Sequence, residues 1–432
     1  MLKNYRNDKP ELFSGILLHL HPKTINKDTL KFNRTFGLGG MAALLIVILF
    51  ITGILLRFYY EPFPQKAYDS ILHLQNNVLF GQLIRNIHHW CGVFLVIISF
   101  LHLLRTFFTG AFQLSRKINW LVGLFLLVLV IASNFTGYLL PWDQLAYWAV
   151  TVGTSLLNYI PIIGPSLRSV IIGGDEVSSS TLLIFFNFHT AVFPILILLL
   201  MAYHFWRVRK AGGVIIPEQE VREMIPVYPN LVYKEFIAAL ALFASILVFA
   251  VFFNAPLLAK SNPDISINPT KAPWYFAGIQ ELLMHFHPFI AAFLIPFAIV
   301  AGLAALPYLN LKEEHSALWF HSDKAKEAAK FSAISAGVIT PLLVITNEFV
   351  PDFETLFPWL NSFVSNGIIP LIILLLIVWY FYKYVSKKYK LTLIELVQTM
   401  FVFITTAFVI LTLIGIFFRG VDMALTFPWN VL

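Results

Sequence analysis

The chain has 432 residues, of which 58% are hydrophobic, 16% aromatic and 12% charged, with a net charge of +7 and a mean hydropathy of +0.77. Soluble globular proteins carry about 25% charged residues, so this composition excludes an ordinary soluble protein, and it also excludes a disordered or collagen-like chain. The single cysteine, Cys91, excludes a disulfide framework, a four-cysteine zinc site, an iron–sulfur cluster and a CxxCH haem attachment.

Stretches without Asp, Glu, Lys or Arg occur along the whole chain, and most reach the roughly 20 residues that a membrane-spanning helix needs. We therefore predict an all-α membrane protein with nine transmembrane helices. No cleavable signal peptide is expected, because polar and basic residues precede the first stretch. The nine stretches are 36–56, 86–104, 118–142, 177–206, 236–259, 282–311, 331–347, 355–382 and 396–418.

Most Lys and Arg residues lie in the odd-numbered connections, counted from the N-terminal segment. Positive charge favours the negative side of a membrane, so the N-terminus is predicted on that side and the C-terminus on the positive side. The same asymmetry explains the net charge without a nucleic-acid partner. The long positive-side connection before residue 177 is rich in apolar residues, Gly and Pro, which predicts short helices on the membrane surface.

A polar linker divides the chain into two parts. We expect an N-terminal four-helix domain over 1–206, a linker over 207–234, and a five-helix C-terminal domain over 235–432.

Four histidines occupy matched positions in the second and fourth spans. His88 and His102 are at positions i and i+14, and His189 and His204 are at positions i and i+15. At about 100° per residue, each pair lies on one helix face, with its members about 21 Å apart along the axis. The two spans run in the same direction, so His88 is level with His189, and His102 with His204. Two facing histidines can supply both axial ligands of a haem iron, so we predict two haems across the bilayer.

A lone histidine in an apolar helix is more often a hydrogen-bonded structural residue or part of a proton path. Four at matched spacing make that explanation much weaker. His89 points about 100° away from His88 and is left out of the ligand set.

Glycines repeat the spacing of the histidines. Gly39 and Gly53 in the first span, and Gly123 and Gly137 in the third, have the same i to i+14 spacing as His88 and His102. A residue without a side chain lets a flat ring approach the backbone, although small residues also serve ordinary helix packing.

Two arginines flank the second span. Arg85 and Arg105 each lie one helical turn from a predicted ligand and are candidates for binding haem propionates. Extension of their side chains to the membrane interface explains them equally well.

Three segments together resemble cytochrome b of the quinol–cytochrome c and quinol–plastocyanin oxidoreductase family. They read RNIHHWCGVFLVIISFLHLLR at 85–105, NFTGYLLPWDQLAYWAV at 134–150 and HTAVFPILILLLMAYH at 189–204. The i to i+15 spacing in the fourth span resembles the chloroplast-type branch, in which the C-terminal half is a separate subunit, so this chain resembles a fusion of the two. The resemblance covers nearly all of the segment 1–210 and continues more weakly to residue 311.

The resemblance implies a dihaem subunit that oxidises quinol near the positive side. One electron then goes to a Rieske iron–sulfur protein, and the other crosses through two non-covalent b-type haems to a quinone site near the negative side. It also implies a cytochrome c-type partner subunit, a homodimeric complex, and a bacterial cytoplasmic membrane. At the negative-side quinone site, Arg209 and Lys210 are candidates to meet a propionate or semiquinone, and positive-inside topology explains them equally well.

Two departures from the family pattern matter. The quinol-oxidation motif Pro-Glu-Trp-Tyr reads KAPWYF here, so Trp274 and Tyr275 match while Pro273 replaces the proton-accepting glutamate. Glu281, two helical turns on, is the candidate replacement; together with Gln280 it is expected to face the pocket, with His285 or His287 as a proton relay. An interfacial charge at a helix start is the alternative for Glu281. KAPWYF-like motifs resemble those of menaquinol-using cytochromes b, so menaquinone is the predicted quinone.

The second departure is the missing thiol near Gly37, where the chloroplast-type branch attaches an extra haem, so no covalent haem is expected. The ninth span exceeds the eight that fused forms usually have, and contact with another subunit is its simplest role. Asp143 matches the family and is expected to be structural.

Two other functions remain open. A dihaem membrane anchor of a dehydrogenase would lack the PWDQ and PWY segments. A secondary transporter would show two related halves, and it leaves the histidine spacing unexplained.

Overall fold

The computed structural model describes residues 23–215, 223–309, 319–320 and 322–431. Within this part of the chain, nine helical segments are long and apolar enough to cross a membrane, as predicted. They are Leu38–Arg57 (α3), Gly81–Phe108 (α5), Lys117–Leu139 (α6), Ser179–Lys210 (α9 and α10), Val227–Phe252 (α11), Ile290–Tyr308 (containing α13), Asp323–Phe349 (α14), Val364–Tyr389 (containing α16) and Leu393–Phe417 (α17).

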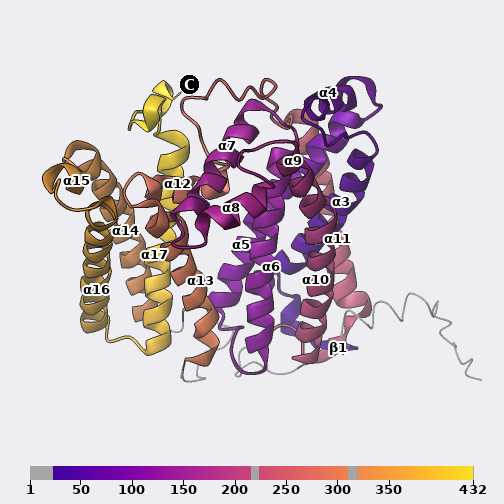
Figure 1. The fold of residues 1–432 in the computed structure, drawn as a ribbon. Helices are drawn as coiled ribbons and strands as arrows, with labels where there is room; N and C mark the ends of the chain where they lie inside the picture. The colour runs from indigo at the N-terminus through magenta and orange to yellow at the C-terminus, as the bar shows by residue number, and fades with distance from the viewer. Residues whose placement is uncertain (1–22, 216–222, 310–318, 321, 432) are drawn as a thin grey trace, which may run out of the picture.

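The N-terminal bundle consists of α3, α5, α6 and the α9–α10 segment (Figure 1). Its apolar core includes Leu45 and Cys91, neither of which is exposed, and Leu95. Helix α11 belongs to this bundle by its contacts, because it packs on α5 and α3, and Ile246 and Ala250 join the same core.

Short helices cover one end of the bundle. Ala67–Asn77 (α4) precedes α5, and the long connection after α6 contains Gln144–Ser155 (α7) and Gly164–Ile172 (α8). The short helices predicted in this connection are therefore present, and their position at the membrane surface stays a prediction. Asp143 begins α7 as its N-cap, accepting a hydrogen bond from the Ala146 N–H at 2.8 Å.

A small sheet lies at the opposite end, where the sequence predicted only a linker. Thr24–Asn26 (β1) pairs antiparallel with Met224–Pro226 (β2). Helix α11 also begins at Val227, inside the segment 207–234. The predicted linker was therefore too long at its C-terminal end. The first residues of the helix, YPNLVYKE, are polar enough to have been read as part of the linker.

The stretch after α11 ties the two parts of the chain together. Asn86 donates to Ala250 O at 2.9 Å and accepts from the Ala255 N–H at 2.8 Å. Asp143 accepts from the Leu258 N–H at 3.0 Å through its second carboxylate oxygen. Asp143 thus has the structural role expected of it: it caps α7 and also connects the start of α7 to the stretch after α11.

The C-terminal helices pack beside the bundle (Figure 1). Helix α17 packs mainly against α14 and Ala277–Leu283 (α12) of the same chain, while α16 lies at the edge with few neighbours. Gln398 of α17 also donates to Phe108 O at the end of α5. The ninth span therefore packs within the chain, and its contact with another subunit stays a prediction.

Candidate functional site

Two histidine pairs face each other between α5 and the α9–α10 segment. The ring centres of His88 and His189, which we call the upper pair, are 6.1 Å apart, and those of His102 and His204 are 6.4 Å apart. The structure thus brings the four predicted residues together in the two predicted pairs.

The distance within each pair fits a metal ion between the rings. Metal–imidazole bonds are about 2.0–2.1 Å long, so two such bonds plus the distances from each ring centre to its nitrogen add up to about 6 Å. Both observed separations match this sum. The residues present therefore suit a bis-histidine haem at each level.

Hydrogen bonds fix the upper pair in the tautomer that a metal requires. Thr52 donates its hydroxyl hydrogen to Ile48 O at 2.7 Å and lies 2.9 Å from His88 Nδ1, so it accepts from that nitrogen. His189 Nδ1 lies 2.9 Å from Ser133 O, which can only accept. Both Nδ1 atoms therefore carry hydrogen, which leaves the Nε2 lone pairs free for a ligand bond. Thr52 was not predicted from the sequence, where its position directly before Gly53 was the available signal.

Each of the four predicted glycines lies against one histidine ring. A Cβ atom at Gly39, Gly53 or Gly123 would lie 3.3–3.4 Å from the nearest imidazole carbon, and one at Gly137 would lie 2.4 Å from His189 Cε1. The glycines therefore let α3 approach the α5 histidines and α6 approach those of the α9–α10 segment. The sequence predicted that a flat ring approaches these glycines, and in the structure the approaching rings are the imidazoles. The approach of a haem to the same glycines stays a prediction.

A π-turn explains why the spacing of His189 and His204 is one position longer than that of His88 and His102. The Phe193 N–H donates to Phe188 O, five positions back, within the π-turn Phe188–Val192 that contains His189. Pro194 follows, and its missing N–H and bulky ring disfavour the regular α-helical bond at this point. The turn absorbs the extra position, so both histidines remain on one face at the levels of their partners.

The two flanking arginines are buried, and both donate hydrogen bonds to backbone carbonyl oxygens. Arg85 donates to Ala255 O at 2.9 Å and Pro256 O at 2.7 Å, and Arg105 Nε donates to Arg34 O at 2.9 Å. Each side chain is only 7% exposed. Extension to the interface is therefore wrong for both, and Arg85 is a tether between α5 and the stretch after α11.

The KAPWYF segment packs onto the N-terminal bundle. Trp274 and Tyr275, in the 3-10 turn Trp274–Phe276, contact its apolar core. The Phe276 ring lies 5.7 Å from that of Phe135, which is on α6 between Ser133 and Gly137. The Trp274 Nε1 and Tyr275 hydroxyl are buried without a hydrogen-bond partner among the residues that the structure describes. Such groups are rare in native structures and mark a position where a polar ligand fits.

The residues after this turn differ from expectation. Gln280 accepts from the Ala272 N–H at 2.8 Å and donates to Thr270 O at 2.7 Å, so its amide holds the segment that precedes the Trp274–Phe276 turn. Its expected position facing the pocket stays a prediction. Glu281 is not exposed at all, and its carboxylate binds Arg419 at 2.6 Å. The expectation of a free carboxylate facing the pocket is therefore wrong. Arg419 was not predicted from the sequence, where its signal was its position directly after the ninth apolar stretch.

Burial raises the pKa of the Glu281 carboxyl, but hydrogen bonds from His285 and Arg419 outweigh this effect, and its pKa is below the ordinary value. Glu281 is thus an ionised carboxylate in an ion pair.

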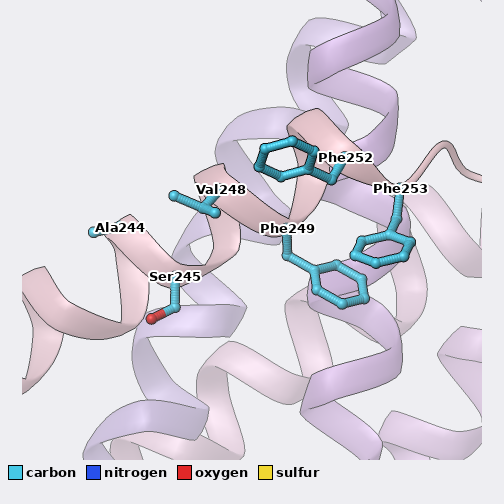
Figure 2. Close-up of a pocket in the computed structure, with 6 residues that line it drawn as sticks. All are labelled: Ala244, Ser245, Val248, Phe249, Phe252 and Phe253. Atoms are coloured by element: carbon cyan, nitrogen blue, oxygen red, sulfur yellow. The ribbon is translucent and has the colours of Figure 1, made fainter.

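A shallow hollow on the surface of α11 is a separate feature (Figure 2). Only one of its lining side chains is polar, and none is among the predicted site residues. They are Ala244, Ser245, Val248, Phe249, Phe252 and Phe253.

These features first define a class: the chain is an integral all-α membrane protein with paired histidines between two parallel helices. Comparison with known proteins gives the family. The model of the family Cytochrome b/b6/petB matches residues 26–212. Cytochrome b6 of Heliomicrobium gestii is 41% identical over 180 residues, which are 42% of this chain and 84% of that protein.

A second relative is the menaquinol:cytochrome c reductase cytochrome b subunit of Geobacillus thermodenitrificans. It is 37% identical over 208 residues, which are 48% of this chain and 93% of that protein. A chain of a structure described as a hyperthermophilic respiratory Complex III superposes with a TM-score of 0.66 at 22% identity, covering 95% of this chain and 98% of that chain, which shows a shared fold. The chain belongs to the cytochrome b family, in agreement with the resemblance in its sequence.

Proposed function

We propose that the chain is the dihaem cytochrome b subunit of a membrane complex that oxidises quinol and passes electrons to a cytochrome c-type acceptor. The observation that carries this proposal is the pair of histidine levels, with ring centres 6.1 and 6.4 Å apart. Family membership and the relative named as a menaquinol:cytochrome c reductase subunit support it. They also favour this function over the membrane-anchor and transporter alternatives.

In this proposal, His88 with His189 and His102 with His204 are the axial ligands of two non-covalent b-type haems. When bound, the haems supply one-electron oxidation and reduction at two depths of the membrane. The protein contributes orientation: Thr52 and Ser133 hold the upper imidazoles, and the four glycines give them room. Arg105 remains a candidate for binding a propionate. Among the hydrogen bonds described, only its Nε donates, to Arg34 O, so its two Nη groups are available.

The quinol-oxidation site lies at Trp274 and Tyr275. Their unpartnered Nε1 and hydroxyl groups suit a quinol oxygen, and menaquinol is the proposed substrate. The segment contacts α6 through Phe135, next to the residues that hold His189. A quinol bound there is therefore close to the upper histidine pair, so an electron has only a short distance to travel.

The proposal extends to the surroundings of the subunit. The partners are a Rieske iron–sulfur protein and a cytochrome c-type subunit in a dimeric complex. The membrane is the bacterial cytoplasmic membrane, with the N-terminus on the negative side. The described residues support this orientation, because β1 lies at one end of the bundle and the segment after α17 at the other (Figure 1). Residues 1–206 form the haem domain and 235–432 complete the quinol site.

The first test is a dithionite-reduced minus oxidised spectrum with a pyridine haemochrome assay of haem per chain. Two non-covalent b haems are expected, with one lost in His88→Ala and one in His102→Ala. His89→Ala is the matched control and keeps both, because the His89 ring contacts Trp90 instead of the paired rings. Absence of haem from folded protein made with haem available would overturn the proposal.

A further inference from the structure

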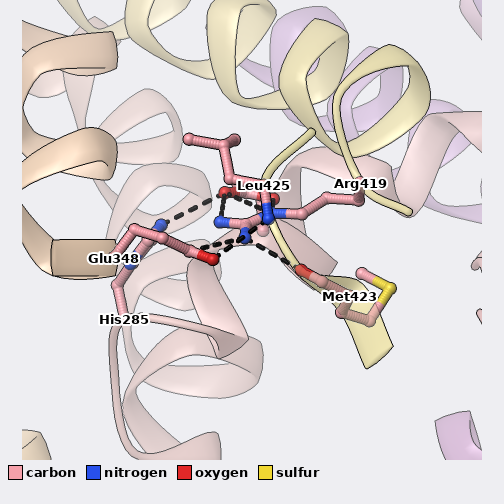
Figure 3. Close-up of polar contacts among 6 residues, drawn as sticks. His285, Glu348, Arg419, Met423 and Leu425 are labelled. Carbon is pink, nitrogen blue, oxygen red and sulfur yellow. Dashed lines mark hydrogen bonds and ion pairs between the residues drawn. The ribbon is translucent and has the colours of Figure 1, made fainter. Parts of the chain in front are cut away.

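A buried charge cluster joins α12, the end of α14 and the segment after α17. Arg419 binds Glu281 through Nη2–Oε1 at 2.6 Å and Nε–Oε2 at 3.0 Å, and it binds Glu348 through Nη1–Oε2 at 2.8 Å (Figure 3). The Arg419 and Glu281 side chains are 1% and 0% exposed. Burying such a pair costs desolvation, and an apolar contact would often be as stable. The cluster therefore calls for a reason other than stability.

His285 is the fourth member of the cluster. Its Nε2 lies 3.2 Å from Glu281 Oε1. An ionised carboxylate can only accept hydrogen bonds, so Nε2 carries the hydrogen of the neutral ring. The other nitrogen, Nδ1, then carries a lone pair, and it is buried with no hydrogen-bond partner in the described part of the chain. The imidazole is thus oriented as a base with an open acceptor position, as when a carboxylate orients a catalytic histidine.

Charged side chains from three elements meet next to His285. Two carboxylates, Glu281 from α12 and Glu348 from α14, bind the guanidinium of Arg419. His287, the other nearby histidine, instead contacts the rings of Tyr159 and Phe363.

The cluster is fixed to the KAPWYF segment from both sides. Helix α12 directly follows the Trp274–Phe276 turn. The segment before the turn is held by the end of the chain: Asn268 and Asp422 form two hydrogen bonds, at 2.6 and 2.7 Å, and Lys271 Nζ donates to Ile416 O at 2.9 Å. The last helix and its following segment therefore hold the turn and the charge cluster as one unit.

We propose that His285 accepts a proton at Nδ1 during quinol oxidation, with Glu281 fixing its tautomer and Arg419 acting as a positioning residue that keeps Glu281 ionised. This inference rests on the proposed function. Oxidation of one quinol to the quinone releases two electrons and two protons. One O–H bond breaks and its proton forms the N–H bond at Nδ1, while the proton of the second O–H bond is released to water on the positive side. One electron goes to the Rieske partner and the other to the haems that the histidine pairs would hold. Glu348, 26% exposed, links the cluster to the surface and marks the direction in which the proton leaves.

The test measures haem reduction by added menaquinol in the purified complex as a function of pH. His285→Gln can still donate to Glu281 but cannot accept a proton, so we expect a rate about 10²-fold lower and the loss of a pH inflection. His287→Gln is the matched control and keeps the wild-type rate and profile. Arg419→Lys is expected to keep more activity than Arg419→Met. Haem content and melting temperature are measured for every variant.

A second measurement examines the positioning role without turnover. Infrared difference spectra on acidification identify the protonated Glu281 carboxyl as the band that is missing in Glu281→Gln. As the pH is lowered, this band is expected to appear at a higher pH in Arg419→Met than in the wild type. Arg419→Lys should show the same change to a smaller degree. An unchanged rate and pH profile in His285→Gln would overturn the inference, and so would an unchanged band in both Arg419 variants. Failure of menaquinol to reduce the haem of the wild-type complex would instead refute the proposed function.

Discussion

Gly137 and Gly123 occupy equivalent positions on α6 but differ in the space beside them. A Cβ at Gly137 would lie 2.4 Å from His189 Cε1, whereas one at Gly123 would lie 3.4 Å from His204 Cε1, an ordinary contact. Gly137→Ala is therefore expected to displace His189, at a cost of about 1–3 kcal/mol typical of overpacking, and to lower occupancy at the upper level. Gly123→Ala is expected to be tolerated. Haem content and thermal unfolding of the two variants check this difference, and equal effects would contradict it.

Because of Glu281, the free energy of unfolding should decrease as the pH is lowered into the acidic range. Burial raises its pKa, but the hydrogen bonds from His285 and Arg419 outweigh this and lower it below the ordinary value of 4.5. A carboxyl with a lower pKa in the folded state stabilises the fold above its unfolded pKa, and this contribution disappears as the pH falls through the folded pKa. The relevant range is thus below about pH 4.5.

Glu281→Gln isolates this contribution. At neutral pH the variant is expected to be less stable by about 3–5 kcal/mol, because Arg419 keeps only Glu348 as an anionic partner. The difference from wild type should narrow as the pH is lowered below about 4.5. Asp69→Asn, which removes an exposed ion pair with Lys260, is the control and should change little. Thermal unfolding in detergent across pH measures both, and a constant difference would contradict the expectation.

At the scale of the element, the π-turn at Phe188–Val192 predicts an asymmetry between the two ligand helices. Deleting Ala191 restores the i to i+14 spacing of a regular helix between His189 and His204, so both haems should remain. Deleting Leu95 from α5, which has no such turn between His88 and His102, should rotate one histidine away by about 100° and remove one haem. Haem per chain measures both, and equal losses would show that the turn does not absorb the extra position.

The ligand helices were predictable because their signal is local. His88 and His102 lie in one apolar stretch, and helical periodicity alone places them on one face. Trp274 and Tyr275 were found by motif. Arg419 was not predictable, because its partner Glu281 is far away in the sequence and the contact depends on how α17 packs on α12.

At the scale of the whole molecule, hydrogen bonds and strand pairing connect the two parts of the chain at both ends of the bundle. We expect that two chains divided between residues 215 and 223 assemble when made together and retain both haems. The Asn86, Arg85 and Asp143 contacts, together with core packing of α11, supply the attachment. Co-purification and haem content test this, with Asp143→Ala as a variant that weakens assembly.

The number of helices followed from the sequence because length and apolar character set a membrane span. The division between parts did not follow as directly. Helix α11 comes after the linker but packs on α5 and α3, and β1 pairs with β2 across the boundary. Such contacts depend on three-dimensional packing between segments that no local pattern relates.

The position of Arg419 has a consequence for biosynthesis. Chains fold largely from the N-terminus as they are made, so the histidine pairs can assemble while the ribosome is still translating α12 and α14. Glu281 lacks its guanidinium partner until α17 has entered the membrane and residue 419 has followed it. If the histidine pairs hold haems as proposed, a ribosome that stalls before α17 would leave a chain that binds haem but lacks the Glu281–Arg419 ion pair.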